Sequence, residues 1–221
     1  MGNKAKDTGR DAGAWHSALA LGLVAVLGTG LLAGVNHLTR ERIAEQESRA
    51  VLQQLQQIIA PGLYDNALHN DQFSFVDPDW FFSNQVVTVY RARLHGEPVA
   101  AVLKLQALDG YSGSIGLLVG INYDGQVAGV RVTKHKETPG LGDAMETGKS
   151  DWILGFEQRS LADPKPASWA VKRDGGEFDQ FTGATITPRA IVKAVKAALE
   201  YFSSHRDWLF EHPSDATGTE S

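Results

Sequence analysis

The longest run of apolar positions lies near the start of the chain. Residues 12–39 contain no Asp, Glu, Lys or Arg, and residues 15–38 read WHSALALGLVAVLGTGLLAGVNHL. A helix of about 20 apolar residues spans the hydrocarbon core of a bilayer, and Trp15 stands at one end, where interfacial aromatic residues are common. The pattern predicts a transmembrane helix at 14–38, preceded by a short tail at 1–13.

Two alternatives compete with a membrane helix. A cleaved signal peptide has an apolar region of roughly 7–15 residues followed by a small-x-small site, and this run is longer and has no convincing cleavage site. A helix buried in a soluble protein is rarely apolar on every side over such a length. Basic residues flank the run almost equally on both sides, so the positive-inside rule decides little. The short tail and the large following domain favour a cytoplasmic N-terminus.

The pattern after the apolar run is amphipathic and then alternating. Residues 39–62 carry apolar side chains at helical spacing and end at Pro61-Gly62, which predicts a linking helix. From residue 85 the period becomes two, and Asp124-Gly125 is a strong hairpin signal. The predicted strands lie at 85–92, 98–106, 115–123, 126–133 and 168–172, with helices at 144–154 and 188–209.

These elements predict an α+β fold class. A single N-terminal transmembrane helix is followed by a domain at 63–209, which has an antiparallel sheet and flanking helices. Residues 210–221 are predicted to be a disordered tail. The tryptophans of this domain are interpreted as packing residues, namely Trp80, Trp152, Trp169 and Trp208.

Composition narrows the possible chemistry. The 221-residue chain is 43% hydrophobic and carries a formal net charge of −5, so it can form a core but shows no basic groove for nucleic acid. It has no cysteine, which excludes iron–sulfur clusters, thiolate zinc sites and haem attached through cysteine. Its seven histidines are scattered, and this gives little support to a metal site. An electron carrier in this chain would have to be an organic cofactor or a metal without thiolate ligands.

The most specific string is DQFTGATITP at residues 179–188. Thr187 is a good N-cap and Pro188 suits the first position of the last helix. The free N–H groups and the dipole of a helix N-terminus favour an anion such as phosphate, beside the hydroxyls of Thr182 and Thr185. The alternative is an ordinary glycine turn before a capped helix.

The same string resembles a known modification motif. Asp179, Thr182, Gly183, Ala184 and Thr185 match D-x-x-[ST]-G-A-T, which a flavin transferase recognises when it attaches FMN to threonine through a phosphoester. The resemblance implies covalent FMN on Thr185, with Thr182, Gly183 and Ala184 beside it and Asp179 used in recognition by the transferase.

Two further segments resemble FMN-binding domains. Residues 137–142 (ETPGLG) are similar to a loop that lies against the flavin, and residues 110–115 (GYSGSI) are similar to the segment that leads into a strand of these domains. The resemblance adds Glu137, Thr138, Leu141, Gly142, Tyr111 and Ser112 to the cofactor site. Glu137 is alternatively a solvated charge beside Lys134 and Lys136, and Tyr111 is alternatively a core aromatic.

Together these segments resemble RnfG (also called RsxG), a component of Rnf-type ion-translocating electron transport complexes that is related to NqrC. The resemblance implies a single-pass bacterial inner-membrane protein with a periplasmic FMN domain. Its partners would be the other membrane subunits and the maturing flavin transferase. It would relay electrons and not act as a self-sufficient enzyme, and no catalytic or metal residues are expected. The alternatives are a non-flavinylated anchored binding or assembly subunit, and a reductase with a substrate of its own.

Overall fold

A computed structural model of the chain describes residues 8–81 and 83–215, and for 8–18, 20, 37 and 40–50 it describes the backbone alone. The chain divides into two units, residues 1–50 and 51–221. The predicted tail at 1–13 lies largely outside the described residues.

The described part of the first unit, residues 8–50, is helical. It belongs to α1 (Thr8–Ile58), which contains the predicted transmembrane segment and most of the predicted linking helix in one continuous helix. The apolar side chains that are described between residues 19 and 38 are exposed, with Leu21 at 77% and Leu32 at 72%. Where side chains are described, no helix has both the length and the hydropathy of a membrane span. The helix ends just before Pro61-Gly62, as the sequence predicts.

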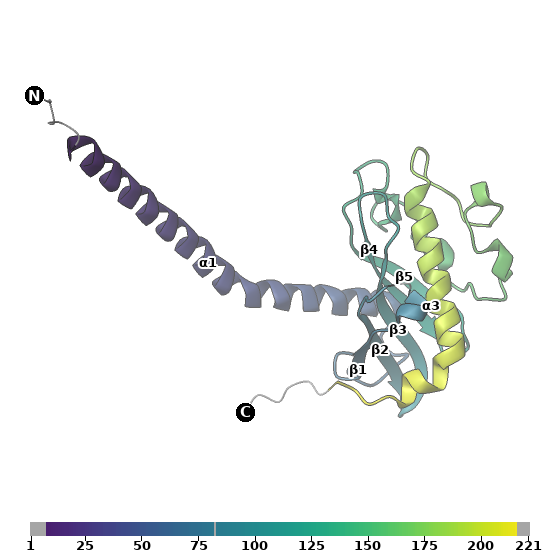
Figure 1. Cartoon of the computed structure of the whole chain (residues 1–221). Coiled ribbons are helices and arrows are strands. Elements are labelled where there is room, and N and C mark those ends of the chain that lie inside the picture. The colour runs from purple at the N-terminus through teal and green to yellow at the C-terminus, as the bar shows by residue number, and fades with distance from the viewer. Residues whose placement is uncertain (1–7, 82, 216–221) are drawn as a thin grey trace, which may run out of the picture. The chain divides into compact units, whose positions relative to one another are not determined.

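The second unit is built on a five-stranded antiparallel sheet in which sequential strands are neighbours (Figure 1). The strands are β1 (Gln72–Phe75), β2 (Val87–Leu94), β3 (Glu97–Ala107), β4 (Ile115–Asn122) and β5 (Val127–Lys134). The four long strands confirm the predicted ones within a few residues. The sequence analysis missed β1, which has only four residues and pairs with β2 at one edge.

The sheet is buried on both faces over much of its area. Alternate residues point to opposite faces of a strand, and so Val89, Ala101 and Leu103 pack with α3 (Ile186–Glu211). Tyr90 and Val102 point the other way and pack with the last turns of α1. In Figure 1, α3 crosses one face of the sheet along most of its length.

The end of α1 approaches the sheet over a pair of glycines. Gly120 of β4 lies opposite Gly129 of β5. A Cβ built on Gly120 would collide with Cγ2 of Ile58, whereas one built on Gly129 would lie 3.6 Å from the Ile58 Cα, an ordinary contact. The absent side chain at Gly120 therefore lets Ile58 reach the sheet.

The irregular segments differ from their predictions. In place of a helix at 144–154 the chain forms two 3₁₀ helices, η1 (Asp143–Met145) and η2 (Trp152–Phe156). In place of a strand at 168–172 it forms η3 (Pro166–Ser168), an isolated bridge at Val171, and η4 (Lys172–Asp174). These segments contribute Trp169 and Phe156 to an aromatic cluster, and this packing overrides their local preference. A short helix, α2 (Pro78–Phe81), precedes β2.

The C-terminal end differs from the predicted disordered tail. α3 continues to Glu211, and Phe210 is buried. The Asp215 N–H donates to the carbonyl of Gln72, and the Asp215 carboxylate accepts from the Ser74 N–H at 2.8 Å. Residues 210–215 are thus part of the domain, because α3 includes the first two, Arg91 binds His212 and Ser214, and Asp215 pairs with β1. Residues 216–221 of the predicted tail lie outside the described residues.

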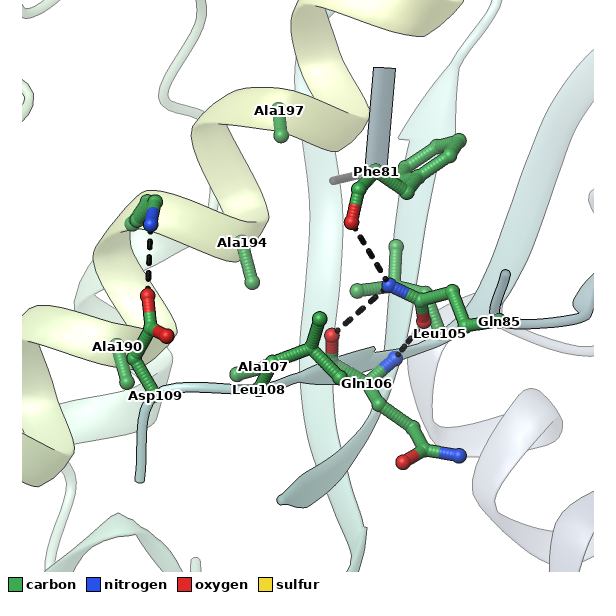
Figure 2. A pocket seen from close by; sticks show the side chains of 11 residues that line it. Phe81, Gln85, Leu105, Gln106, Ala107, Leu108, Asp109, Ala190, Ala194 and Ala197 are labelled. Atoms are coloured by element: carbon green, nitrogen blue, oxygen red, sulfur yellow. Dashed lines mark hydrogen bonds and ion pairs between the residues drawn. The ribbon is translucent and has the colours of Figure 1, made fainter. Parts of the chain in front are cut away.

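α3 packs closely on the end of β3 because its facing residues are alanines. Figure 2 shows Ala190, Ala194 and Ala197 on one side of a cavity of about 100 Å³, with Leu105 and Ala107 among the residues opposite. The Gln85 side chain pairs with the backbone of Gln106, as a strand residue would. An ion pair of 2.6 Å between Asp109 and Lys193 crosses from this strand end to the helix.

Candidate functional site

A tight turn precedes α3. The Ala184 N–H donates to the Phe181 carbonyl at 3.1 Å, which closes a four-residue turn around Thr182 and Gly183. Gly183 has a φ of +79°, a left-handed conformation that favours glycine because it has no Cβ. The turn connects the aromatic cluster to the start of α3.

Thr185 is the N-cap residue of α3. The first helical bond runs from the Arg189 N–H to the Thr185 carbonyl, and so the helix begins two residues earlier than the cap predicted at Thr187. The Thr185 side chain makes no capping hydrogen bond, which leaves its hydroxyl at the positive end of the helix dipole. Thr187 is instead fully buried in the first turn.

A cavity of about 240 Å³ opens beside Thr185. Three segments far apart in the sequence form its walls: the loop before β4, the loop after β5 and the start of α3. Its lining residues are Tyr111, Glu137, Thr138, Leu141, Gly142, Gly183, Ala184, Thr185, Ile186 and Thr187. The structure therefore brings eight of the sequence-predicted site residues together.

The remaining predicted residues lie outside the lining. Ser112 is next to it and contributes a backbone N–H to Glu137. Thr182 is exposed on the turn, and Asp179 is held outside the cavity by an ion pair of 2.6 Å with Lys172. Ile186 and Thr187 line the cavity although the sequence analysis did not assign them to the site.

Glu137 is the polar centre of the site and is only 5% exposed. Its carboxylate accepts from the Ser112 N–H at 3.0 Å and from the Thr187 hydroxyl at 2.7 Å. Its own N–H donates to His135 Nδ1, so the His135 Nε2 carries the proton donated to Glu146 at 2.8 Å. The interpretation of Glu137 as a solvated charge is therefore wrong, since its carboxylate fastens all three walls together.

The loop after β5 is compact. The Thr138 carbonyl accepts from the N–H groups of Leu141 and Gly142, both at 3.1 Å. A Cβ on Gly142 would lie 2.8 Å from Oε2 of Glu137, and so only glycine fits there. The Asp143 carboxylate accepts a hydrogen bond from the Gly140 N–H. Partial desolvation by itself raises the pKa of Asp143. The interactions with Lys149 and with the Gly140 N–H outweigh this effect, and so the pKa lies below its usual range.

Three basic side chains lie around the start of α3. Arg173 Nη1 lies 3.5 Å from Thr185 Oγ1. Arg189 forms two hydrogen bonds to Asp174, of 2.6 and 2.8 Å, and these keep the pKa of the Asp174 carboxyl below its usual range. Lys172 forms an ion pair with Asp179. Arg173 is therefore the cation that lies beside the hydroxyl, whereas the other two bind carboxylates away from it.

The rim of the cavity is apolar and exposed. Tyr111 is 70% exposed, Leu141 47% and Ile186 43%. Tyr111 is therefore not a core aromatic. Among the residues that the structure describes, no three His, Asp or Glu side chains form a metal site.

Comparison with known proteins identifies the family. Residues 110–200 match the model of the FMN-binding domain, and residues 14–58 match the RnfG N-terminal region. The chain is 49% identical over 205 residues to the G component of the ion-translocating oxidoreductase complex of Pseudomonas aeruginosa, covering 93% of this chain and 95% of the relative. The same component of Photorhabdus laumondii is 50% identical, covering 84% of this chain and 88% of the relative. The G component of Pseudoalteromonas atlantica is 45% identical, covering 88% of this chain and 90% of the relative.

The chain belongs to the RnfG family of ion-translocating oxidoreductase complexes. This confirms the family resemblance drawn from residues 110–115, 137–142 and 179–185. The FMN-binding match covers all three segments and all the walls of the cavity.

The residues of the cavity fit FMN. Its phosphate would meet the Thr185 hydroxyl, the guanidinium group of Arg173 and the first free N–H groups of α3. The apolar dimethylbenzene part and the faces of its ring system would meet Tyr111, Leu141 and Ile186, which are exposed. The sequence analysis missed Arg173 because no motif residue marks it. Its position depends on the fold of 171–178.

Proposed function

We propose that this protein is a membrane-anchored electron-transfer subunit that carries FMN within an Rnf-type ion-translocating oxidoreductase complex. The FMN-binding match and the relatives named as components of such a complex support this function. When bound, FMN can exchange one or two electrons with its partners. The protein supplies the attachment point, the binding pocket and the electrostatic surroundings.

The proposed attachment is a phosphoester between Thr185 Oγ1 and the FMN phosphate, made by a separate flavin transferase. The observation that carries this proposal is the Thr185 hydroxyl at the start of α3, which lines the cavity, makes no capping bond and accepts a 3.5 Å hydrogen bond from Arg173. Thr182 is exposed outside the cavity, and Thr187 lines the cavity but donates its proton to Glu137. Of these three threonines, Thr185 alone lines the cavity without donating its hydroxyl proton to Glu137.

The pocket residues have distinct roles in this proposal. Arg173 would neutralise the phosphodiester, which carries one negative charge. Gly183 and Ala184 leave room beside the ester, and Asp179 would be read by the transferase. Glu137 would hold the walls in place, while Thr138, Leu141, Gly142, Tyr111 and Ser112 shape the side that faces the ring. No residue acts as a general base, because electron relay requires none.

The proposed location is the bacterial inner membrane, with a single α1 anchor, a cytoplasmic tail and a periplasmic domain. The support is the uncharged stretch at 12–39, the exposed apolar side chains along it and the match to the RnfG N-terminal region. The partners would be the other membrane subunits of the complex. Protease accessibility in spheroplasts tests the orientation: the domain should be digested from the periplasmic side.

Intact-mass analysis of protein purified from cells with a working transferase tests the attachment. The wild type should carry the added mass of one FMN ester and show a fluorescent band in a denaturing gel. Thr185→Val should lose both signals, whereas Thr182→Val, its matched control, should keep an attached flavin at reduced yield. Flavin bound covalently in Thr185→Val would refute the assignment.

The same sample separates the alternative functions. A non-flavinylated binding or assembly subunit would be colourless and of unmodified mass in the wild type. A reductase with its own substrate would turn over NADH as an isolated protein, whereas a relay subunit would show little turnover.

A further inference from the structure

A second hollow, distinct from the flavin cavity, lies on the face of the sheet opposite α3. It has a volume of about 530 Å³ and is lined by Val86, Thr88, Lys104, Leu105, Gln106, Ser114, Gly116, Thr133, Lys134, His135 and Lys136. The lining contains three lysines, three hydroxyl groups and one histidine, and it contains no Asp or Glu. Here it is called the basic hollow.

Register explains why the basic hollow exists. Gly116 of β4 lies between Gln106 of β3 and Lys134 of β5. A glycine in the middle of this row leaves a gap between the two long side chains. A β-bulge at Gly116/Leu117 inserts Thr133 as an extra residue, and its hydroxyl lies where a Cβ of Gly116 would be. The floor of the basic hollow is thus open and rich in hydrogen-bond donors.

The sheet face is apolar one row before this point. Leu55 and Ile58 of α1 pack with Leu118, which is fully buried. The next row on the same face contains Gly116 and Lys134, and both line the basic hollow. The sheet face therefore changes from an apolar contact to a cationic lining within two residues.

The lysines of the basic hollow have no carboxylate of their own. Within residues 8–81 and 83–215, no ion pair involves Lys104, Lys134 or Lys136. Among the described side chains, Glu146 is bound to a residue of the lining, His135, at 2.8 Å. In a chain of net charge −5, this local excess of positive charge favours an anionic ligand.

The basic hollow shares a wall with the flavin cavity. The shared wall consists of residues 112–114 and 135–137. Ser114 and Lys136 line the basic hollow. Glu137 lines the flavin cavity and accepts a hydrogen bond from the Ser112 N–H. The Glu137 N–H also donates to His135 of the hollow. A molecule docked in the hollow is therefore next to the flavin site.

We propose that the basic hollow is the docking surface for an acidic segment of the subunit that exchanges electrons with the flavin. The proposal rests on the proposed function. Lys104 lies opposite Leu118 and Lys134 lies opposite Gly116, so the two lysines are two strands and two residues apart, roughly 12 Å at the spacing of a sheet. That separation suits several carboxylates along a polypeptide better than one small anion. Charge complementarity of this kind steers a partner to a specific orientation.

The spacing also disfavours lipid headgroups as the occupant. Several lysines at this spacing suit the carboxylates of a polypeptide better than one headgroup phosphate. The acidic occupant is accordingly assigned to a protein partner, and anionic lipid is an outcome of the test.

Carbodiimide cross-linking of the purified membrane complex tests the docking. This reagent joins a lysine to a carboxylate in direct contact with it. Peptide mass mapping should find Lys104, Lys134 or Lys136 linked to Asp or Glu of another subunit, and ~0.5 M NaCl should suppress the link because screening weakens exposed charge pairs. Absence of any such link, or links only within this chain, would overturn the proposal.

Flavin reduction in the same complex gives a second readout. Lys104→Gln/Lys134→Gln should lower the rate at low salt by about tenfold and remove its salt dependence, with unchanged flavin content. The control Lys165→Gln/Lys196→Gln removes equal charge elsewhere on the domain. Equal rates and salt slopes in the two double variants would contradict protein docking. A difference seen only in nanodiscs of anionic phosphatidylglycerol would assign the hollow to lipid and overturn the proposal.

The two proposals fail in different ways. A colourless wild type of unmodified mass refutes the flavin attachment, yet the cross-link still reports on docking. Conversely, a fully flavinylated complex without the cross-link refutes the docking surface alone.

Discussion

The hydroxyl of Thr187 donates a 2.7 Å hydrogen bond to the carboxylate of Glu137, a residue fifty positions earlier in the chain. Both residues are buried: Thr187 is fully buried, and Glu137 is 5% exposed. This bond joins the loop after β5 to the first turn of α3. This buried polar contact therefore helps to set the position of Thr185 relative to the loop.

Thr187→Val should destabilise the domain. The substitution preserves shape but leaves Glu137 Oε2 buried without its donor, which costs about 1–3 kcal/mol. Urea unfolding of the full chain in detergent, followed by tryptophan fluorescence, measures the change. Thr182→Val is the control, because Thr182 is exposed and should leave the midpoint unchanged. Equal midpoints for both variants would contradict the role assigned to this hydrogen bond.

Arg173→Gln should lower flavin attachment several-fold without changing stability. The side chain is exposed, and it lies 3.5 Å from the Thr185 hydroxyl, where it would pair with the phosphate. Arg173→Lys keeps the charge and should fall between the wild type and Arg173→Gln. In-gel flavin fluorescence per mole of protein measures attachment, and Lys165→Gln controls for the loss of one cation. Full fluorescence in Arg173→Gln would show that this cation does not act on the phosphate.

Stability should fall in acid through Asp71. Burial by itself raises the pKa of Asp71, but hydrogen bonds from Arg93, Arg91 and Ser214 and the charge of Arg91 outweigh it and hold the pKa below the usual value of 3.8. A carboxyl with a lowered folded pKa adds stability above its unfolded pKa, and this stability is lost as pH falls through the folded pKa. The loss should therefore begin below about pH 4.

Asp71→Asn isolates this contribution. It leaves the 2%-exposed Arg91 without its carboxylate and should cost about 3 kcal/mol at pH 7. The difference from the wild type should shrink toward pH 3, as measured by urea midpoints across pH. Asp65→Asn, at a largely exposed ion pair with His95, is the control. A difference that is constant from pH 7 to pH 3 would rule out the linkage.

Gly120→Ala should be more harmful than Gly129→Ala. The added methyl at 120 collides with Ile58, and over-packing of this kind costs roughly 1–3 kcal/mol, whereas the methyl at 129 makes an ordinary contact. Ile58→Ala should partly rescue Gly120→Ala in a double-mutant cycle. Thermal unfolding measures all four variants. Equal effects at both glycines would show that Ile58 does not rest on Gly120.

Much of the sheet and the last helix follows from the sequence, because alternating and helical periods record which faces are buried. β1 does not follow, because its four residues are stabilised by β2 and by Asp215, far along the chain. The start of α3 was predicted two residues late, since Thr187-Pro188 has the better local cap pattern, but Thr187 is used by Glu137 instead. The motif residues predicted most of the cavity lining. Arg173 and the basic hollow could not be predicted, because both depend on the arrangement of segments far apart in the sequence.

The far end of α3 is fastened as firmly as its start. Arg91 and Arg93 donate to the carbonyls of Leu209 and Phe210 and to Asp71, and so they tie the last turn to β2. A cofactor held at the opposite end of this helix would be carried by the domain as one body. Large changes in its distance to a redox partner would then come from movement of the whole domain, and electron-transfer rates should respond to the length and stiffness of residues 39–50.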